Sequence, residues 1–511
     1  MLSRVYSGAV YGVNAFPVEI EINCTKGDFR FVTVGLPDAA VKESKDRVWT
    51  ALGNSGLKPK QLPHITINLA PADIKKEGPV YDLPIAVGLV EALGIEKFRD
   101  LSEFAMIGEL ALSGEVRRVQ GVLPVTLAMR DQGKRGILVP ADNAEEAAVA
   151  EGITVYPVRN LREAVDFLAG KYQLEPCHTD LRTLINRNRK YTEDFSDVKG
   201  QETAKRAIEI AVSGGHNLLM IGSPGAGKTM LARRIPTILP EMTLEEALEA
   251  TRIHSIAGTL KSHQALVVHR PFRSPHHTIS DAGLLGGGTH PLPGEVSLAH
   301  RGVLFLDELP EFHRNALEVL RQPLEDGFVT ISRAAATLDF PSKFMLVAAM
   351  NPCPCGYSGD PQRECRCSSQ KIQAYRNKIS GPLLDRIDLH IEVPPVKYAE
   401  LSSLERGETS EQIRARVVAC RARQLERFKG TSVTCNADMT VRDISRFCHL
   451  RADAAELLKM AMSELNFSAR AYNRIVKVAR TIADMDQAEE ITDQHISEAI
   501  QYRSLDRMMW V

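Results

Sequence analysis

The stretch GSPGAGKT, residues 222–229, decides the fold of this 511-residue chain. The apolar run LLMI before it predicts a strand, and the pattern LARRI after it predicts a helix. Between the two, glycines let backbone N–H groups surround a phosphate, the lysine reaches the β- and γ-phosphates, and the threonine holds Mg²⁺. We therefore expect a nucleoside triphosphate to bind through Gly222, Ser223, Pro224, Gly225, Ala226, Gly227, Lys228 and Thr229.

The loop motif alone does not establish a nucleotide site, because the same pattern also occurs in glycine-rich turns. A nucleotide site needs a second, acidic motif downstream. The sequence GVLFLDE supplies it, with an apolar strand that ends in Asp307 and Glu308. Ligands of open α/β sheets bind at this carboxyl edge. Asp307 suits the magnesium shell together with Thr229, and Glu308 suits orienting and polarising the attacking water. The alternative is an acidic pair that caps the next helix.

The composition is that of an ordinary soluble protein. Hydrophobic residues make up 44% and charged residues 25% of the chain. The length favours roughly two to four domains. A net charge of -1 gives no overall attraction to nucleic acid or acidic membranes, so such binding depends on local patches. No apolar run approaches the roughly 18 residues that span a bilayer, so we expect a cytoplasmic protein without membrane contact.

Changes of pattern divide the sequence into four parts. Residues 1–170 alternate strand-like and helical runs, which predicts an α/β or α+β domain. Residues 171–192 are polar and aperiodic, and we expect them to be a linker. The α/β core with the phosphate loop spans residues 193–396, and residues 397–511 show helical periodicity nearly throughout.

Two further polar residues lie close to predicted strands of the core. Asn351 ends the apolar strand FMLVAAMN, where it either orients water near the γ-phosphate or only forms a turn before Pro352. Arg386, in LLDRID, either pairs with Asp385 or Asp388 or projects into a neighbouring subunit to neutralise transition-state charge.

The order of these motifs resembles the AAA+ ATPases of the magnesium-chelatase-like branch. With HRPFRSPHHTISDAGLLGGG, MNPCPCGY and SARAYNRIVKVARTIAD, the chain resembles the ComM/YifB family over nearly its whole length. The resemblance implies a homohexameric ring with ATP and Mg²⁺. It also implies a helical lid over the nucleotide and roles for sensor 1 (Asn351), the arginine finger (Arg386), sensor 2 (Arg470) and the base pocket (Gly200, Gln201).

The N-terminal part resembles the Lon-protease fold. A Lon-type protease needs a serine nucleophile and a lysine base. This chain has Val80, Tyr81 and Asp82 in the corresponding stretch and Leu123 at the lysine position. We therefore expect a non-proteolytic docking or oligomerisation module.

Nine cysteines in a large intracellular protein favour thiols or metal ligands over disulfides. Four of them cluster on the loop after the third strand. They either close a tetrahedral structural Zn²⁺ site or remain reduced thiols in a turn. These cysteines are Cys353, Cys355, Cys365 and Cys367.

Candidate DNA contacts lie in the same core. GFVTISRAAATLDF predicts a hairpin carrying Arg333, and the glycine-rich run 283–288 predicts a mobile loop near a ring pore. Arg333, Arg270 and Arg273 either track a phosphate backbone or are solvated surface charges. The arginine-rich helical stretch 412–429 contacts either nucleic acid or acidic neighbours, and we interpret His276 and His277 as ordinary polar residues.

These observations favour an ATP-hydrolysing ring motor. The family resemblance implies that it acts on single-stranded or branched DNA, as a helicase or branch-migration enzyme in recombination or natural transformation, with recombination proteins as partners. The alternative is an ATPase that remodels proteins or assists a metal chelatase together with partner subunits. A protease is a third class, which the missing serine and lysine disfavour.

Overall fold

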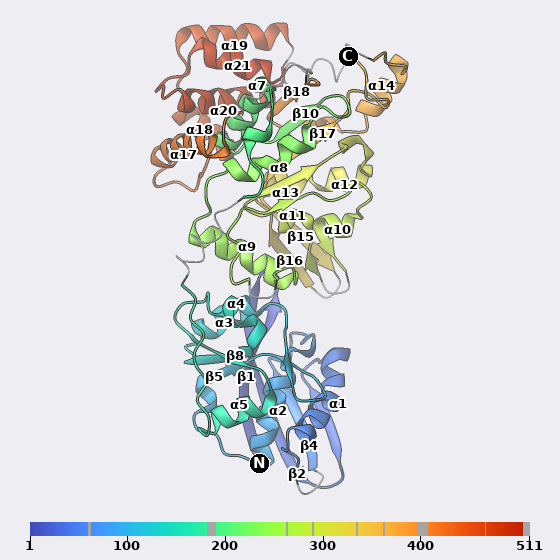
Figure 1. Cartoon of the computed structure of the whole chain (residues 1–511), viewed down its shortest axis with the longest axis vertical. Coiled ribbons are helices and arrows are strands. Elements are labelled where there is room, and N and C mark those ends of the chain that lie inside the picture. The colour runs from blue at the N-terminus through green and yellow to red at the C-terminus, as the bar shows by residue number, and fades with distance from the viewer. Residues whose placement is uncertain are drawn as a thin grey trace. The chain divides into compact units, whose positions relative to one another are not determined.

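The computed structural model describes residues 1–59, 63–180, 191–261, 264–288, 291–333, 336–360, 363–396, 407–465 and 467–503. The chain forms two compact units (Figure 1). The N-terminal unit comprises residues 1–188, 244–268 and 332–340, and the C-terminal unit comprises the rest. The expected boundary at residues 171–192 is therefore only the first crossing, because two later segments return to the N-terminal unit.

The N-terminal unit is built on a seven-stranded sheet of order β3-β4-β2-β1-β5-β8-β9. β1 and β2 pair antiparallel, as do β2 and β4, whereas the remaining pairs are parallel, so the sheet is mixed. The alternating burial of β4 shows that one face is covered by the core. The strands are β1 Leu2–Tyr11, β2 Asn14–Lys26, β3 Arg30–Val34, β4 Pro63–Ala70, β5 Phe104–Met106, β8 Gly136–Pro140 and β9 Thr154–Val158.

Helices complete this α+β unit. α2 is buried over nearly its full length and packs against β1, β2 and α1. The helices are α1 Ala39–Asn54, α2 Asp82–Ala92, α3 Val122–Asp131, α4 Ala144–Ala147 and α5 Leu161–Leu168.

The positions compared with the Lon catalytic pair are structural. Tyr81 and Leu123 are fully buried, and Asp82 is buried at the start of α2. Arg47 donates to Asp82 with an Nε–Oδ2 distance of 2.7 Å, and the Leu110 N–H donates to the same carboxylate at 3.2 Å. Burial raises the pKa of Asp82, and the hydrogen bonds from Arg47 and Ser44 oppose that rise. These residues thus hold α1 to α2, and none of the positions compared with the catalytic pair is a serine or a lysine.

A segment from the middle of the chain belongs to the N-terminal unit. It contains α9, Leu244–Ile256, which packs against α3. Ser255 donates to Glu146 at 2.5 Å, and its carbonyl accepts from the Gly121 N–H at 3.2 Å. Arg118 donates to the Leu260 carbonyl at 2.7 Å. The sequence pattern did not indicate this attachment.

The C-terminal unit contains a five-stranded parallel sheet of order β11-β14-β17-β10-β18. If these five strands are numbered by their order in the chain, their order across the sheet is 2-3-4-1-5. β14, β17 and β10 are buried throughout, as expected for a parallel sheet with helices on both faces. The strands are β10 Leu218–Ile221, β11 Phe272–Arg273, β14 Val303–Leu306, β17 Met345–Met350 and β18 Leu389–Glu392.

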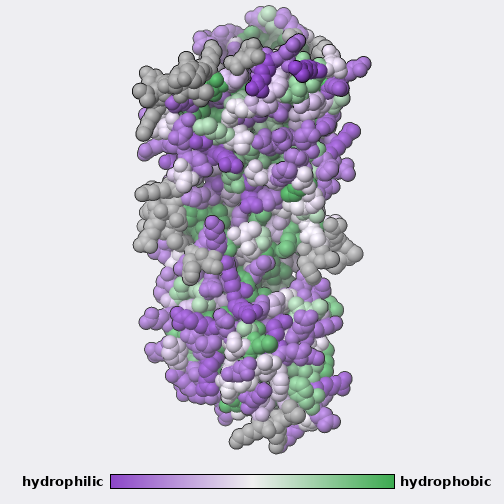
Figure 2. Space-filling view, turned by 45° about the vertical axis from the view of Figure 1, so that its right-hand side comes forward, coloured by the Kyte–Doolittle hydropathy of each residue, from purple (hydrophilic) through white to green (hydrophobic). Residues whose placement is uncertain are grey.

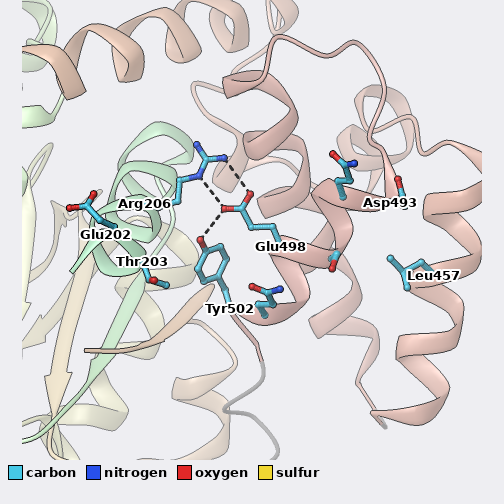
Figure 3. Close-up of a pocket in the computed structure, with 10 residues that line it drawn as sticks. Glu202, Thr203, Arg206, Leu457, Asp493, Glu498 and Tyr502 are labelled. Atoms are coloured by element: carbon cyan, nitrogen blue, oxygen red, sulfur yellow. Dashed lines mark hydrogen bonds and ion pairs between the residues drawn. The ribbon is translucent and has the colours of Figure 1, made fainter. Parts of the chain in front are cut away.

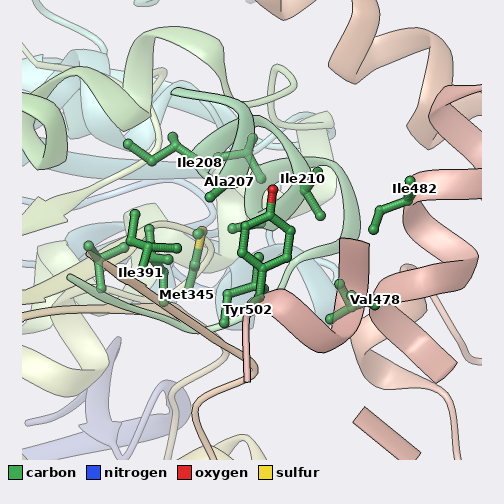
Figure 4. Close-up of a cluster of buried hydrophobic side chains, with 14 of the residues drawn as sticks. Ala207, Ile208, Ile210, Met345, Ile391, Val478, Ile482 and Tyr502 are labelled. Carbon is green, nitrogen blue, oxygen red and sulfur yellow. The ribbon is translucent and has the colours of Figure 1, made fainter. Parts of the chain in front are cut away.

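Helix α7, Glu202–Gly214, joins the sheet to the C-terminal helices. Ala207, Ile208 and Ile210 of α7 lie in one hydrophobic cluster with strand residues and with Val478 and Ile482 of α20 (Figure 4). The other helices around this core are α8 Lys228–Ile238, α17 Ser410–Arg427, α18 Val441–Phe447, α19 Ala452–Glu464, α20 Ala469–Met485 and α21 Asp493–Gln501.

The surface in view in Figure 2 carries mainly hydrophilic residues, with small hydrophobic groups between them. Among the described residues, no helix has both the length and the apolar character needed to cross a bilayer.

Removing the Asp82 carboxylate should destabilise the N-terminal unit. Asp82→Ala leaves Arg47 without its buried partner, which costs about 3 kcal/mol. Urea unfolding followed by Trp49 fluorescence measures this, in a Trp510→Phe background because the chain has two tryptophans. Asp46→Ala, which removes an exposed carboxylate beside Arg47 on α1, is the control and should unfold like the parent. Equal midpoints for Asp82→Ala and the parent would contradict the structural role.

Candidate nucleotide-binding site

The loop at residues 222–229 joins β10 to α8 and has the shape of a phosphate cradle. Gly222 donates its N–H to the Met350 carbonyl at 3.2 Å, and a Cβ at this position would lie 2.3 Å from the Val393 carbonyl oxygen. Gly227 has φ +88°, a left-handed conformation that favours glycine. Both glycines are therefore required by the backbone path, and the loop leads directly into the N-terminus of α8.

Lys228 is buried in the centre of this loop. Its ammonium donates to the Gly222 carbonyl at 2.6 Å, to the Ser223 carbonyl at 3.0 Å and to Asn351 Oδ1 at 3.2 Å. Burial lowers the pKa of Lys228, and the negative charges of Asp307 and Glu308 oppose that shift. The lysine, the carboxylates and the amide of Asn351 thus share one site at the carboxyl edge of the sheet.

The two halves expected from the sequence meet. Thr229 Oγ1 donates to Asp307 Oδ2 at 2.7 Å, and the Glu308 N–H donates to Asp307 Oδ1 at 2.9 Å. A hydroxyl and a carboxylate are the hard oxygen donors that Mg²⁺ prefers beside substrate phosphates. The residues present therefore fit a magnesium site, which Thr229 and Asp307 would hold.

Glu308 has a partner that sequence reasoning missed. His277 Nδ1 lies 3.2 Å from Glu308 Oε2. Glu308 has φ +53° and ψ +46°, a left-handed conformation that is costly for a residue with a side chain. His277 follows the edge strand β11, which pairs parallel with β14, so both residues leave the sheet at the same edge. The feature of the sequence that could have indicated His277 is its position shortly after a strand. Its spacing from the nearest carboxylate in the sequence gives no such indication.

Gln201 connects the start of α7 to the same loop. Its amide donates to the Ala226 carbonyl at 2.5 Å and to the Pro394 carbonyl at 3.1 Å. Gly200 and Gln201 both have positive φ, which makes a tight turn before α7. This contact places the predicted base-pocket element against the phosphate loop, while its role in binding a base stays a prediction.

Comparisons with known proteins agree with this geometry. Three family models match the chain: "Magnesium chelatase, subunit ChlI" at residues 194–401, "Subunit ChlI of Mg-chelatase" at 20–143, and "Magnesium chelatase, subunit ChlI C-terminal" at 407–503. Competence protein ComM of Haemophilus influenzae is 45% identical over 99% of this chain and 98% of its own length. The uncharacterized protein YifB of Escherichia coli has the same identity and coverage. Lon protease 2 of Bacillus subtilis is 28% identical over 31% of each chain.

The chain belongs to the ComM/YifB family of magnesium-chelatase-like AAA+ ATPases. The expected fold is confirmed: an AAA+ core, an N-terminal unit with Lon-like similarity, and a helical C-terminal region. The family is one of ATPases, which supports ATP and Mg²⁺ as the ligands of the loop and of the Thr229–Asp307 pair.

Two arginines assigned from the family resemblance lie at the other edge of the sheet. β18 runs parallel to β10 with Leu389 opposite Leu218, so Arg386 precedes the amino end of β18. The Asn217 amide, just before β10, donates to the Arg386 carbonyl at 2.9 Å. Arg470 Nη1 lies 3.8 Å from Asp385 Oδ2 at that edge.

Arg470 therefore lies away from the phosphate loop of its own chain. Helix α20 packs against α7, and its first turn lies beside Asp385 rather than beside Lys228. Arg386 is buried and pairs with Glu325 and the Pro382 carbonyl rather than with Asp385 or Asp388. Burial, together with the like charges of Arg321, Arg470 and Arg474, lowers the pKa of Arg386. Action of Arg386 and Arg470 on a neighbouring chain stays a prediction.

The candidate DNA contacts have structural partners where their side chains are described. Arg270 donates to the Pro240, Arg301 and Glu241 carbonyls, and Arg273 forms two 2.6 Å hydrogen bonds with Glu295. The side chain of Arg333 lies outside the described residues, although β15 Phe328–Arg333 and β16 Ala336–Pro341 do form the predicted hairpin. The geometry gives Arg270 and Arg273 no support as DNA contacts.

The glycine-rich run 283–288 and the arginine-rich helix at 412–429 were the other candidate DNA-contacting segments. Much of the glycine-rich run is ordered, in α10 Asp281–Leu285 and in β12 Gly286–Gly287, which pairs with β13 Leu292–Pro293. On α17, Arg416 binds Glu209 and Glu408, and Arg427 binds Asp484. These pairs agree with the interpretation in which this helix faces acidic neighbours.

The cysteine cluster is assembled beside the nucleotide site. The four sulfur atoms lie within 4.8 Å of one another, with Sγ–Sγ distances of 3.3 Å for Cys353–Cys355, 3.6 Å for Cys355–Cys365 and 3.7 Å for Cys353–Cys365. Hydrogen bonds from the Tyr357 backbone and from Cys353 lower the pKa of Cys355 to about 6. The fourth member is Cys367, so all four predicted ligands converge.

An open hollow of about 700 Å³ lies between α7, α19 and α21, away from these residues. Arg206 and Tyr502 both point at Glu498 there, at 3.1 Å and 3.0 Å (Figure 3). The residues that line this hollow include none of the phosphate loop. We therefore assign the nucleotide to the loop and not to this hollow.

Replacing the Glu308 carboxylate should separate ATP binding from hydrolysis. Glu308→Gln keeps the size of the side chain but cannot polarise water, so kcat should fall about 10²- to 10⁴-fold with ATP affinity retained. Lys228→Ala should lose ATP binding. Phosphate release and binding of a fluorescent ATP analogue measure the two effects. Glu311→Gln, which removes the partner of Lys378, is the control and should stay near wild type. Unchanged turnover in Glu308→Gln would remove Glu308 from the mechanism.

Proposed function

We propose that this protein is an ATP-driven ring motor that acts on DNA as a helicase or branch-migration enzyme during recombination or natural transformation. The observation that carries the ATPase step is the contact between Thr229 and Asp307, which brings the phosphate loop and the acidic strand end to one site. The DNA step is supported by the 45% identity with a competence protein. Competence is the uptake of DNA by cells, so a motor on single-stranded or branched DNA fits that relationship.

The residues at the carboxyl edge divide the hydrolytic work among them. Lys228 and the loop N–H groups neutralise charge on the transferred phosphoryl group, and Glu308 orients and polarises the attacking water. Asn351 holds the Lys228 ammonium in place through its side-chain oxygen. Bound Mg²⁺ would supply further charge neutralisation on the β- and γ-phosphates.

A homohexameric ring would place the arginines of one chain near the phosphates of the next. The support for this proposal is the cluster of Arg321, Arg386, Arg470 and Arg474, whose like charges act on Arg386. That cluster lies at the edge opposite the phosphate loop, so it cannot serve the site of its own chain. To contact the phosphates of a neighbouring chain, Arg386 would have to break its ion pair with Glu325 and bind phosphate oxygens instead.

The second candidate function is an ATPase that remodels proteins or assists a metal chelatase. The match of three ChlI family models favours it, because magnesium chelatase works on a porphyrin with partner subunits. Both candidates share the ATPase step and differ only in what stimulates it. Proteolysis is not a candidate, because Val80, Tyr81, Asp82 and Leu123 replace the catalytic positions.

We also propose Zn²⁺ as the ligand of the cysteine cluster. A tetrahedral site with Zn–S bonds of about 2.3 Å requires sulfur atoms about 3.8 Å apart. The three measured Sγ–Sγ distances, 3.3, 3.6 and 3.7 Å, are close to that value. The cluster therefore needs only small adjustments to accept the ion.

DNA should stimulate ATP turnover if the motor proposal is correct. ATPase rates are measured without DNA and with single-stranded, duplex and four-way-junction DNA, using Glu308→Gln as the hydrolysis-dead control. We expect the highest rates with branched or single-stranded DNA, loss of stimulation in Arg333→Ala, and no degradation of casein. Sedimentation with ATP and Mg²⁺ should show a hexamer. Turnover that ignores every nucleic acid but responds to an unfolded protein would favour the remodelling class instead.

A further inference from the structure

We infer that the cysteine cluster is a metal-dependent brace for the nucleotide site: Zn²⁺ on the four thiolates fixes the loop that positions Asn351 and supports Pro224 of the phosphate loop. This inference rests on the proposed zinc site. Its consequence is that ATP hydrolysis depends on zinc occupancy although the metal takes no part in the chemistry.

The cysteine loop begins at a residue of the nucleotide site. β17 ends at Met350, and the next residue, Asn351, accepts a hydrogen bond from the Lys228 ammonium at 3.2 Å. Cys353 follows two residues later and is fully buried. A metal on Cys353 therefore restrains the backbone immediately after the residue that holds the lysine.

The loop also returns to its starting point. After Cys367 the chain enters α14, Ser369–Arg376. The hydroxyl of the buried Tyr375 is hydrogen-bonded to the backbone of Asn351, and Arg376 donates to the Pro352 carbonyl at 3.4 Å. Both ends of the excursion are thus tied to the same two residues, so a cross-link among its cysteines closes a small rigid unit.

The middle of the loop touches the phosphate loop. Gly356, next to Cys355, lies so close to Pro224 that a Cβ would come within 2.5 Å of its Cδ and 2.6 Å of its Cγ. Gly356 also has φ +87° and donates its N–H to the Cys353 carbonyl at 3.0 Å. The turn at Gly356 therefore packs against Pro224, and a metal on the neighbouring cysteines would hold this turn in place.

A short polar loop has little apolar surface of its own to bury, so coordination supplies most of its order. Without the metal, the four thiols no longer share an ion and the turn at Gly356 is free to relax. Pro224 and Asn351 then lose support at the same time. Because hydrolysis depends on positioning, displacements of about 1 Å are costly, on the order of 10²-fold in rate.

The brace is tested with two glycine variants of the same loop. Gly356→Ala places a methyl group against Pro224, whereas Gly359→Ala has a similar positive φ of +80° but nothing within 4 Å of the new Cβ. Both should retain about one zinc per chain, measured by plasma mass spectrometry. We expect Gly356→Ala to lower kcat/KM for ATP by about tenfold or more, while Gly359→Ala stays within about twofold.

Zinc removal supplies the second arm. Cys365→Ser/Cys367→Ser should release the metal, weaken binding of a fluorescent ATP analogue and lower ATP turnover, while circular dichroism confirms that the chain is folded. If the purified protein carries no zinc and all four thiols react freely with a thiol reagent, the brace is overturned. If zinc is bound but the Cys365→Ser/Cys367→Ser and Gly356→Ala proteins bind and hydrolyse ATP like wild type, the metal is only structural.

Neither of these two negative outcomes would contradict the proposal that the protein is an ATPase. That proposal fails only if the wild-type protein does not hydrolyse ATP. In that case, analogue binding by the same variants still decides whether the cysteine loop supports the phosphate loop.

Discussion

The contact between the Thr229 hydroxyl and the Asp307 carboxylate is the interaction on which the site depends. These residues belong to β10–α8 and to the end of β14, and β17 lies between those strands in the sheet. They meet because three parallel strands end at one edge and because Gly222 lets the chain pass beside the Val393 carbonyl before turning into α8. A parallel sheet with buried strands keeps these ends in register, so the metal-binding pair is a product of the topology rather than of local sequence.

The same topology sorts charges to opposite edges. The carboxyl edge gathers Lys228, Asp307, Glu308 and His277, whereas the amino edge holds the arginines around Asp385. Lys228 neutralises phosphate charge at its own edge, but the guanidinium groups lie where no phosphate of the same chain reaches. The phosphate loop and the arginine cluster of one chain therefore lie at different edges of the sheet, and the ring proposed above would bring them together between neighbouring chains. Within a single chain, Arg386 Nη1 and Nη2 donate to the Pro382 carbonyl and to Glu325, whereas its buried Nε has no hydrogen-bond partner among the described residues.

The sequence was sufficient where short motifs carry the geometry. The phosphate loop, Asp307 and Asn351 were predicted because each lies within a few residues of a strand end, and the four cysteines were predicted from their clustering in one loop. His277 was missed because β11 has only two residues and leaves almost no strand pattern. The sequence could not place Arg470 beside Asp385, because helical periodicity fixes which face of α20 is buried and not which edge of the sheet its first turn reaches. Likewise, nothing in the α9 sequence indicates that its buried face packs against α3.

The chain passes between the two units more than once. Segment 244–268 leaves the C-terminal unit shortly after α8, is held in the N-terminal unit by Ser255 and Glu146, and returns just before β11 and His277. α8 begins with Lys228 and Thr229, and His277 contacts Glu308. One segment of the N-terminal unit thus lies, in chain order, between the phosphate loop and the segment that carries His277. Since the positions compared with the Lon catalytic pair are filled by buried structural residues, such as Tyr81 and Asp82, the covalent path through segment 244–268 is what links this unit to the nucleotide site.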